Sequence, residues 1–299
     1  MEEASRCLQC PTPQACVRAC PAGNDIPRAL WFIEQGAFIE AAEVFRETSN
    51  LPEICSRVCP QVVQCEGSCV QEGYGEGVPI GMLERFVMDY QDRVEGGSPV
   101  VERAPDTGHH VAIIGAGPAG LTVAEELTRR GHDVTIYDAW PRAGGTARYG
   151  IPSFKLPKDV IDEKVEQLEA MGARFRFNTR VGQDVSIDEI LDGEADAVFL
   201  GTGAGVSAPL KVPGNDLEGI FQATPFLIRS NLPPEDVPDY LGGKPDIGRK
   251  VAVIGGGDSA MDCLRSSIRL GAEEVTCVYR RTEEQMPGNI LERKNAREE

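Results

Sequence analysis

Long apolar runs are absent from this sequence. No stretch approaches the roughly 18 apolar residues that indicate a membrane-spanning helix, and the N-terminal MEEASRCLQC has neither the basic nor the apolar region of a secretory signal. We therefore expect a cytoplasmic protein without a membrane partner. In that compartment disulfides are rare, and clustered cysteines usually bind metal or carry out redox chemistry.

Basic residues are also few, with 30 Lys and Arg against 47 Asp and Glu. The formal net charge of −17 argues against nucleic-acid phosphates or anionic lipids as partners. It favours a soluble enzyme or an enzyme subunit. The length of 299 residues allows about two or three domains.

Histidine is scarce as well, and the three histidines (His109, His110 and His132) lie far from the cysteines. Eight of the ten cysteines fall in two runs, CLQCPTPQACVRAC (7–20) and CSRVCPQVVQCEGSC (55–69). Zinc sites favour CxxC pairs or mixtures of cysteine and histidine, and only Cys7–Cys10 has the CxxC form. Zinc and disulfides are thus weaker alternatives for these thiols.

Iron–sulfur clusters fit the two runs better. A [4Fe–4S] cluster takes four thiolates, and both runs contain the Cys-x3-Cys-Pro ending of bacterial ferredoxins, at Cys20-Pro21 and Cys59-Pro60. In ferredoxins the last cysteine before the proline serves the other cluster, so we expect the ligands of two clusters to interleave. Counting thiols alone would use all eight.

The segment between the two runs has apolar residues at helical spacing. Residues 26–47 are interrupted by Gly36, so they are expected to form two short helices. We interpret residues 1–106 as a small helical domain that binds the clusters. The linker EGGSPVVERAPDTGHH closes it, and residues 107–247 and 248–299 are expected to form two Rossmann-type α/β domains.

The first of these domains opens with a dinucleotide-binding pattern. An apolar strand at 111–114 leads into Gly115-x-Gly117-x-x-Gly120, with Ala119 in the same turn, and a helix and a second strand come next. That strand ends at Asp138, 18 residues after the third glycine, where an acid binds a ribose hydroxyl. The turn predicts a pyrophosphate at the helix N-terminus.

The pattern recurs about 140 residues later. The strand at 251–254 precedes Gly255-x-Gly257, with Ala260 at the third position, which tolerates alanine. Tyr279 occupies the position of Asp138, and Arg280 and Arg281 come directly after it. An acid would repel a 2′-phosphate, whereas two guanidinium groups would bind one. The first unit is therefore predicted to bind FAD or NAD and the second NADP(H), with NAD(H) as the alternative.

Two such units beside two clusters predict an electron-transfer chain. A flavin accepts an electron pair and releases single electrons, which a [4Fe–4S] cluster requires. Hydride transfer needs alignment of the two rings and no proton relay, so no catalytic side chain is predicted. The rival hypothesis is an electron-conducting or scaffolding subunit without turnover.

The motifs also resemble those of a known family. SRVCP, IGMLERF, GAGPAGL, GGTARYGIPSFKLPK, GTGA and VYRRTEEQMPGN occur in the order found in the flavin and iron–sulfur module of the glutamate synthase small subunit. The N-terminal half of dihydropyrimidine dehydrogenase and the large subunit of ferredoxin-dependent transhydrogenases share this module. The resemblance implies an NAD(P)H-oxidising FAD enzyme with two [4Fe–4S] clusters. It also implies a second redox subunit as partner, either like the glutamate synthase large subunit, linked to ferredoxin, or another reductase.

The resemblance further implies which residues hold the cofactors. One cluster would take Cys7, Cys10, Cys16 and Cys69, and the other would take Cys20, Cys59, Cys65 and Glu84. Cys55 would then be spare, in contrast to the eight-thiol count. For FAD the resemblance adds Gly144, Gly145, Lys155, Val181, Gly201, Thr202 and Gly203, and for the nicotinamide cofactor Gly255, Gly257 and Asp258.

The C-terminal ILERKNAREE is expected to form a polar helix directly after the second strand of the second unit. A mononucleotide-binding half needs three strands. The second Rossmann-type domain is therefore expected to be incomplete, either because the chain is a fragment or because another chain completes it.

Overall fold

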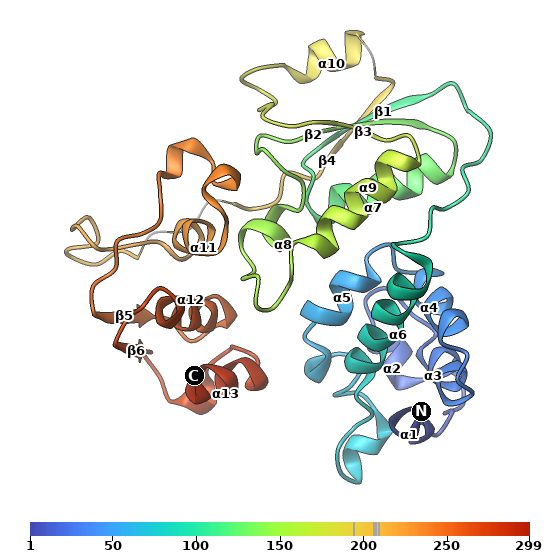
Figure 1. Ribbon diagram of the computed structural model, residues 1–299, viewed down its shortest axis with the longest axis horizontal. Coiled ribbons are helices and arrows are strands. Elements are labelled where there is room, and N and C mark those ends of the chain that lie inside the picture. Colours follow the sequence, from blue (N-terminus) through green and yellow to red (C-terminus); the bar gives the residue numbers. More distant parts are fainter. Residues whose placement is uncertain (194, 206–207, 209) are drawn as a thin grey trace.

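The computed structural model describes residues 1–193, 195–205, 208 and 210–299. It shows a helical unit at the N-terminus, a unit built on a four-stranded sheet, and a unit built on a two-stranded sheet (Figure 1). The helical unit and the two-stranded unit lie side by side below the four-stranded unit in this view. The predicted α/β class with a helical N-terminal domain is confirmed.

The helical unit packs around a core of its own. Its helices are α1 (Glu2–Ser5), α2 (Ala15–Ala19), α3 (Ile26–Glu34), α4 (Phe38–Arg46), α5 (Pro52–Val58) and α6 (Ile80–Glu95), with short 3-10 turns η1 (Gln61–Val63) and η2 (Val70–Gly73). Gly36, at φ +76, separates α3 from α4 as expected. Apolar side chains fill most of the contact between α3, α4 and α6, with Leu30, Phe45 and Val87 at most 1% exposed.

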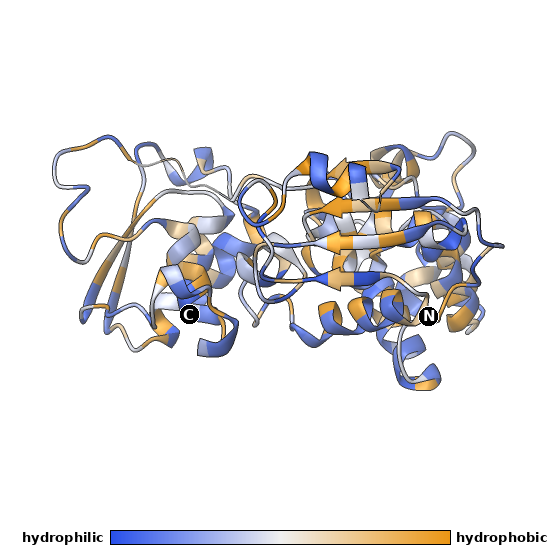
Figure 2. Ribbon diagram, turned by 90° about the horizontal axis from the view of Figure 1, so that it is seen from above, coloured by the Kyte–Doolittle hydropathy of each residue, from blue (hydrophilic) through white to orange (hydrophobic). Residues whose placement is uncertain are grey.

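The four-stranded sheet is parallel throughout. Its strands are β1 (His110–Ile114), β2 (Asp133–Tyr137), β3 (Arg174–Arg176) and β4 (Ala197–Leu200), in the order β3-β2-β1-β4. The crossovers carry α7 (Pro118–Arg129), α8 (Gly145–Tyr149), α9 (Asp159–Ala170) and α10 (Ile187–Gly193). Figure 2 shows the strands as largely hydrophobic bands, whereas the surrounding helices carry both hydrophobic and hydrophilic residues.

Alternate residues of the strands face opposite sides of this sheet. Ile113 and Ile136 pack with the residues of α7 and α9, while Ala112 and Tyr137 pack with Ile190 of α10. Helices therefore cover both faces, as a buried parallel sheet requires. The carboxyl ends of the strands, where ligands bind in such folds, meet at one edge.

The helical unit shares its apolar contacts with the sheet unit. Leu51 and Ile54, at the start of α5, belong to the same buried cluster as Ile113 and Leu121. Helix α5 also contacts α9. The cysteine-bearing helix α5 is thus packed directly on the four-stranded unit.

The remaining elements belong to the second nucleotide unit or lie beside it. They are α11 (Ala223–Asn231), η3 (Pro234–Asp236), η4 (Asp239–Leu241), β5 (Lys250–Ile254), α12 (Asp258–Arg269), β6 (Glu274–Val278), η5 (Glu283–Gln285) and α13 (Ile290–Glu298). Strands β5 and β6 pair in parallel, and the predicted polar helix is α13. Helix α11 contacts both α8 and α12, so it packs on both sides of the boundary predicted at 247.

Among the described residues, none of the helices combines the length and the apolar character needed to cross a bilayer.

Candidate functional site

A cleft of about 690 Å³ opens at the carboxyl ends of β1, β2 and β4. Most residues predicted for the flavin nucleotide line it: Gly115, Gly117, Ala119, Asp138, Gly145, Val181, Gly201, Thr202 and Gly203. These residues come from five separate segments of the chain. The edge of a parallel sheet at the strand ends is where dinucleotides bind in this type of fold.

Glycines make the close approaches that shape the cleft. A Cβ at Gly120 would lie 1.9 Å from Gly115 O, so the helix can pack on the strand only because Gly120 has no side chain. A Cβ at Gly145 would lie 2.8 Å from Gly117 Cα. Gly120 and Gly144 support the cleft from behind and do not line it, and Gly144 N donates to Ala116 O at 2.8 Å.

Asp138 joins the two loops at the cleft. Its Oδ2 accepts from Ala116 N at 2.7 Å and its Oδ1 accepts from Trp140 N at 2.9 Å. Burial raises the pKa of this carboxyl group, which these two donors counteract. Each carboxylate oxygen has a second acceptor site. Asp138 therefore orders the glycine turn and retains capacity for a ribose hydroxyl.

Several lining residues were not predicted from the sequence. Trp140, Thr146, Thr179, Arg180 and Leu200 also line the cleft. Arg180 and Thr179 lie after β3, which has only three residues, too few for a clear strand pattern. Their position directly after a third strand of the same sheet was the sequence feature from which these two residues could have been predicted.

Lys155 lies outside this cleft. Its Nζ lies 3.0 Å from Asp262 Oδ1 and 3.3 Å from Glu292 Oε2, both in the second nucleotide unit. The structure does not bring Lys155 together with the other residues expected at the flavin.

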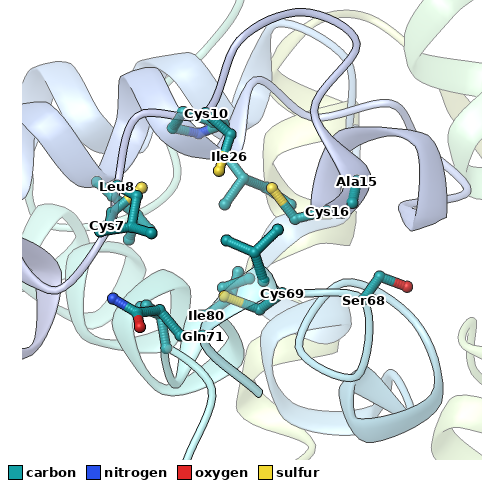
Figure 3. A pocket seen from close by; sticks show the side chains of 14 residues that line it. Cys7, Leu8, Cys10, Ala15, Cys16, Ile26, Ser68, Cys69, Gln71 and Ile80 are labelled. Atoms are coloured by element: carbon teal, nitrogen blue, oxygen red, sulfur yellow. The ribbon is translucent and has the colours of Figure 1, made fainter. Parts of the chain in front are cut away.

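Four of the predicted cluster ligands surround one small hollow. Cys7, Cys10, Cys16 and Cys69 line it, together with Leu8 and other apolar residues (Figure 3). Burial, together with the negative charges of the neighbouring Cys7 and Cys69, raises the pKa of Cys16 to about 11. Thiolates held this close and this dry repel one another, and a bound cationic group would relieve that repulsion.

The other predicted set also gathers in space. Burial, together with the negative charges of Glu66, Cys20 and Glu84, raises the pKa of Cys65 to about 12. A hydrogen bond with the Cys55 side chain lowers the pKa of Cys59, whereas burial and the charges of Glu84, Cys65 and Cys20 act in the opposite direction. Cys20, Cys59, Cys65 and Glu84 therefore lie near enough to one another for their charges to interact.

Glu84 is a buried carboxyl group with an unused oxygen. Its side chain is 6% exposed, and in the described part of the chain its Oε1 has no hydrogen-bond partner. Burial raises the pKa of Glu84, with the negative charge of Cys55 as the next cause. Such an orphaned acceptor next to two thiols fits a metal ligand.

Cys55 lies beside Cys59 and Glu84 and also contacts the four-stranded unit. A hydrogen bond to the Cys59 side chain and burial raise the pKa of Cys55. Its side chain packs against the apolar cluster of the four-stranded unit.

Within the ranges that the structure describes, no three or more His, Cys, Asp and Glu side chains are grouped so that they could hold a single metal ion.

The second glycine turn has the same local form as the first. Gly255 has φ +149 and Gly257 precedes α12, but Asp258 Oδ1 accepts from Asn289 N at 2.7 Å. Gly288 N donates to Gly256 O at 2.9 Å, so the segment before α13 lies against this turn.

Arg280 and Arg281 lie after β6 and are exposed. Among the described residues, neither guanidinium group makes an ion pair or a side-chain hydrogen bond, whereas nearby Arg297 pairs with Glu283. Two unpaired guanidinium groups therefore directly follow Tyr279, which occupies the position of Asp138 in the first unit.

Comparisons with known proteins agree with this geometry. The family described as dihydropyrimidine dehydrogenase domain II, 4Fe–4S cluster, matches residues 1–95, and the pyridine nucleotide-disulphide oxidoreductase family matches residues 109–294. The chain is 44% identical to the glutamate synthase [NADPH] small chain of Escherichia coli (strain K12), over 99% of this chain and 63% of that protein. It is 36% identical to the NADPH-Fe(3+) oxidoreductase subunit beta of Geobacter sulfurreducens, over 95% of this chain and 41% of that protein.

Solved structures show the same fold. The His57Gln mutant of FprA from Mycobacterium tuberculosis is 25% identical, with a TM-score of 0.55 over 65% of this chain and 48% of that one. A complex of 2-naphthoyl-CoA reductase shares the fold at 22% identity, with a TM-score of 0.52 over 92% of this chain and 39% of that one.

The chain spans at most 63% of the length of the curated relatives named above. The predicted resemblance to the glutamate synthase small subunit is confirmed. Because the larger of the two family matches covers well over half of its residues, the chain belongs to the pyridine nucleotide-disulphide oxidoreductase family and carries a 4Fe–4S domain at its N-terminal end.

Proposed function

We propose that this protein takes hydride from NADPH onto FAD and passes single electrons through two [4Fe–4S] clusters to a second redox subunit. One observation carries the proposal. Helix α5, which leads into Cys59, packs directly on the core of the unit that contains the nucleotide cleft. The thiol groups and the cleft are therefore parts of one continuous packed body, as electron transfer between them requires.

The cleft has the features that FAD needs. The N-terminus of α7 presents backbone N–H groups to a pyrophosphate, and Gly117 and Gly145 leave room for it. Asp138 would accept a hydrogen bond from the ribose, and Arg180 supplies a positive charge in the same cleft. When bound, the flavin supplies the step from electron pairs to single electrons.

The two ligand groups support two clusters. Cys7, Cys10, Cys16 and Cys69 would hold one, and Cys20, Cys59, Cys65 and Glu84 would hold the other. The second group includes Cys59, directly after the helix that contacts the four-stranded unit. We infer that the second group receives electrons first and that the first group passes them on.

The second unit favours NADPH over NADH. Arg280 and Arg281 are unpaired among the described residues and stand at the position that reads the 2′-substituent of the ribose. The names of the relatives in Escherichia coli and Geobacter sulfurreducens both include NADPH. Those names also describe one relative as a small chain and the other as a subunit. This supports a partner chain, such as a glutamate synthase large subunit, that accepts the electrons from this protein.

The proposal is tested on anaerobically purified protein. We expect about eight irons per chain, with matching sulfide, one FAD, and bleaching of the flavin absorbance by NADPH. An artificial electron acceptor should then be reduced at the expense of NADPH. Zinc in place of iron, or a flavin that NADPH does not bleach, would contradict the proposal, and the second result would favour a conducting subunit without turnover.

The ligand assignment has its own test. Glu84→Ala should remove or alter the paramagnetic signal of one reduced cluster, because it deletes a proposed ligand. Cys55→Ser should leave both signals in place, since Cys55 is proposed to be spare. The reverse pattern would show that eight thiols hold the clusters.

A further inference from the structure

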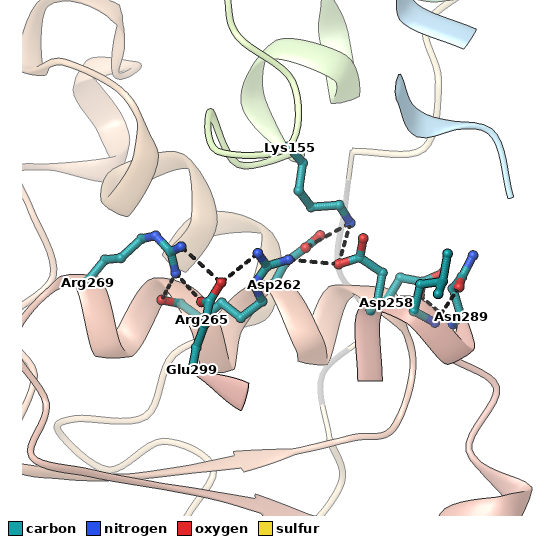
Figure 4. A network of polar contacts seen from close by, with 9 residues as sticks. Lys155, Asp258, Asp262, Arg265, Arg269, Asn289 and Glu299 are labelled. Carbon is teal, nitrogen blue, oxygen red and sulfur yellow. Dashed lines mark hydrogen bonds and ion pairs between the residues drawn. The ribbon is translucent and has the colours of Figure 1, made fainter. Parts of the chain in front are cut away.

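Lys155 connects the two nucleotide units. It lies on the loop between α8 and α9 in the first unit, and its Nζ reaches Asp262 of α12 at 3.0 Å and Glu292 of α13 at 3.3 Å (Figure 4). We call this contact the interunit ion pair. Sequence separations of 107 and 137 residues make it a purely tertiary contact.

One of the two acceptors of Lys155, Glu292, is held in place by Arg265. Arg265 Nη1 lies 3.0 Å from Glu292 Oε2, and Arg265 Nη2 lies 2.8 Å from Glu299 Oε1. Phe154, the neighbour of Lys155, lies under Arg265 and Arg269 at 4.4 and 4.0 Å from its ring centre. The loop of the first unit therefore meets an organised surface on the second.

The interunit ion pair is largely shielded from water. The side chains of Lys155, Asp262 and Glu292 are 16%, 8% and 18% exposed. A buried charge that loses its partner is strongly unfavourable, so these groups favour one relative position of the two units. Exposed ion pairs do not fix the relative position of two units in this way. Lys250 and Glu274 form such a pair, with side chains that are 79% and 56% exposed.

Each end of the contact is close in the chain to a nucleotide site. On one side, the segment from Gly145, which lines the cleft, runs through α8 to Lys155, and Leu156 is fully buried in the core. On the other side, Asp262 lies one helical turn after Asp258, which begins α12 at the second glycine turn. Movement at the interunit ion pair would therefore shift one nucleotide site relative to the other.

We propose that Lys155 is a positioning residue that holds the nicotinamide-binding unit against the flavin-binding unit through Asp262 and Glu292. This inference rests on the proposed function. Hydride transfer needs reacting atoms about 3–3.5 Å apart, and a displacement of about 1 Å can slow such a step about a hundredfold. Lys155 thus acts on the alignment of the two rings without contacting either.

The test measures flavin reduction by NADPH in rapid-mixing experiments. Lys155→Met and, on the opposite unit, Asp262→Asn should each slow the reduction by about tenfold or more. Lys155→Arg keeps the charge and should retain the rate within about threefold. Lys250→Met, the matched control, removes an exposed ion pair of the same kind and should leave the rate unchanged.

A second pair of measurements separates positioning from a direct effect on the flavin. The flavin absorbance spectrum and its reduction by dithionite should match wild type in Lys155→Met and Asp262→Asn, because neither residue contacts the flavin. A shifted spectrum in Lys155→Met, with a normal rate in Asp262→Asn, would overturn the proposal in favour of a flavin contact. Wild-type rates in both variants would overturn it as well.

Hydrogen exchange keeps the inference separate from the proposed function. Lys155→Met and Asp262→Asn should both speed amide exchange in the loop at 151–156 and in α12 by about threefold or more, whether or not NADPH reduces the flavin. Unchanged exchange in these segments would overturn the interunit contact. A wild type that NADPH fails to reduce, combined with faster exchange in the variants, would contradict the proposed function and retain the contact.

Discussion

The two nucleotide units share a backbone pattern and differ in the residues at the end of their second strand. In both, a parallel strand pair flanks a glycine turn and a helix, with Val111 opposite Val134 in the first unit and Val251 opposite Val275 in the second. The first unit then places a half-buried Asp138 against the turn, whereas the second has Tyr279 at that position, followed by two exposed arginines. Under the proposed function, each of these scaffolds would hold a pyrophosphate, and the residues after the second strand would select the rest of the cofactor.

The units also differ in how tightly the turn packs. In the first, Gly120 leaves no room for a methyl group, whereas the second has Ala260 at the equivalent position. The first sheet is covered on both faces, and Ala112 and Ile113 are fully buried. In β5, by contrast, Ile254 is 66% exposed.

The largest expected effect comes from exchanging the third residue of each turn. Gly120→Ala places a Cβ 1.9 Å from Gly115 O, so α7 must move and stability should fall by about 3 kcal/mol, with loss of FAD. Ala260→Gly should cost only about 1 kcal/mol, from helix propensity. Thermal unfolding measures the stability of both variants, and the FAD content after gel filtration measures cofactor retention. Full FAD retention in Gly120→Ala would contradict the expected difference between the two units.

Replacing the residue after the second strand should have the next largest effect. Asp138→Ala removes the carboxylate that accepts hydrogen bonds from Ala116 N and Trp140 N, so both N–H groups lose their charged acceptor. FAD affinity should fall by about 2–3 kcal/mol, or about a hundredfold. Tyr279→Phe loses one exposed hydrogen bond, to Gln285 O, and should change NADPH affinity less than about threefold. Titration of each cofactor checks the contrast, and equal losses in the two units would contradict it.

The arginine pair is expected to control cofactor choice with a comparable or smaller effect. Arg280→Ala/Arg281→Ala should weaken NADPH binding by about 1.5–3 kcal/mol, or roughly ten- to a hundredfold, and leave NADH nearly unaffected. Arg293→Ala/Arg297→Ala removes the same charge nearby, from side chains that contact Glu283, and serves as the control. Equal weakening for both cofactors would show that the arginines do not read the phosphate.

The smallest effect concerns the helical unit, which packs on the first nucleotide unit through α5 and α9. Burial, with Asp92 as the next cause, raises the pKa of Glu163 in α9 from 4.5 to about 7. A raised carboxyl pKa favours the protonated form in the folded state, so its stabilising effect is present below pH 4.5 and is lost as the pH rises through about 7.

Glu163→Gln should therefore be more stable than wild type at pH 8 and equal to it near pH 4.5. Solvent screens most of the charge on Glu163, so we expect the free energies of unfolding of the variant and the wild type to differ by about 1 kcal/mol at most. Chemical unfolding between pH 6 and 8.5 should show the advantage of Glu163→Gln growing with pH. An advantage that shrinks with rising pH would contradict the raised pKa.

Local spacing predicted much of this molecule. The pair of helices around Gly36, the two glycine turns, and the placement of Asp138 and Tyr279 after equivalent strands all arise from short-range patterns. Such features depend on residues within about 30 positions of one another, which is why sequence alone identifies them. The grouping of the cysteines into two interleaved sets needed the family resemblance as well, because spacing alone allowed all eight thiols to bind.

Sequence by itself thus determined the two cofactor-binding patterns, the acidic character and the cysteine-rich start of the chain. Only the tertiary structure decided that Arg180 and Trp140 line the cleft and that Lys155 reaches the second unit. It also decided that α5 shares a core with the four-stranded sheet. These contacts join residues that are distant in sequence, and they arise because buried surfaces and charges must find partners across the whole fold.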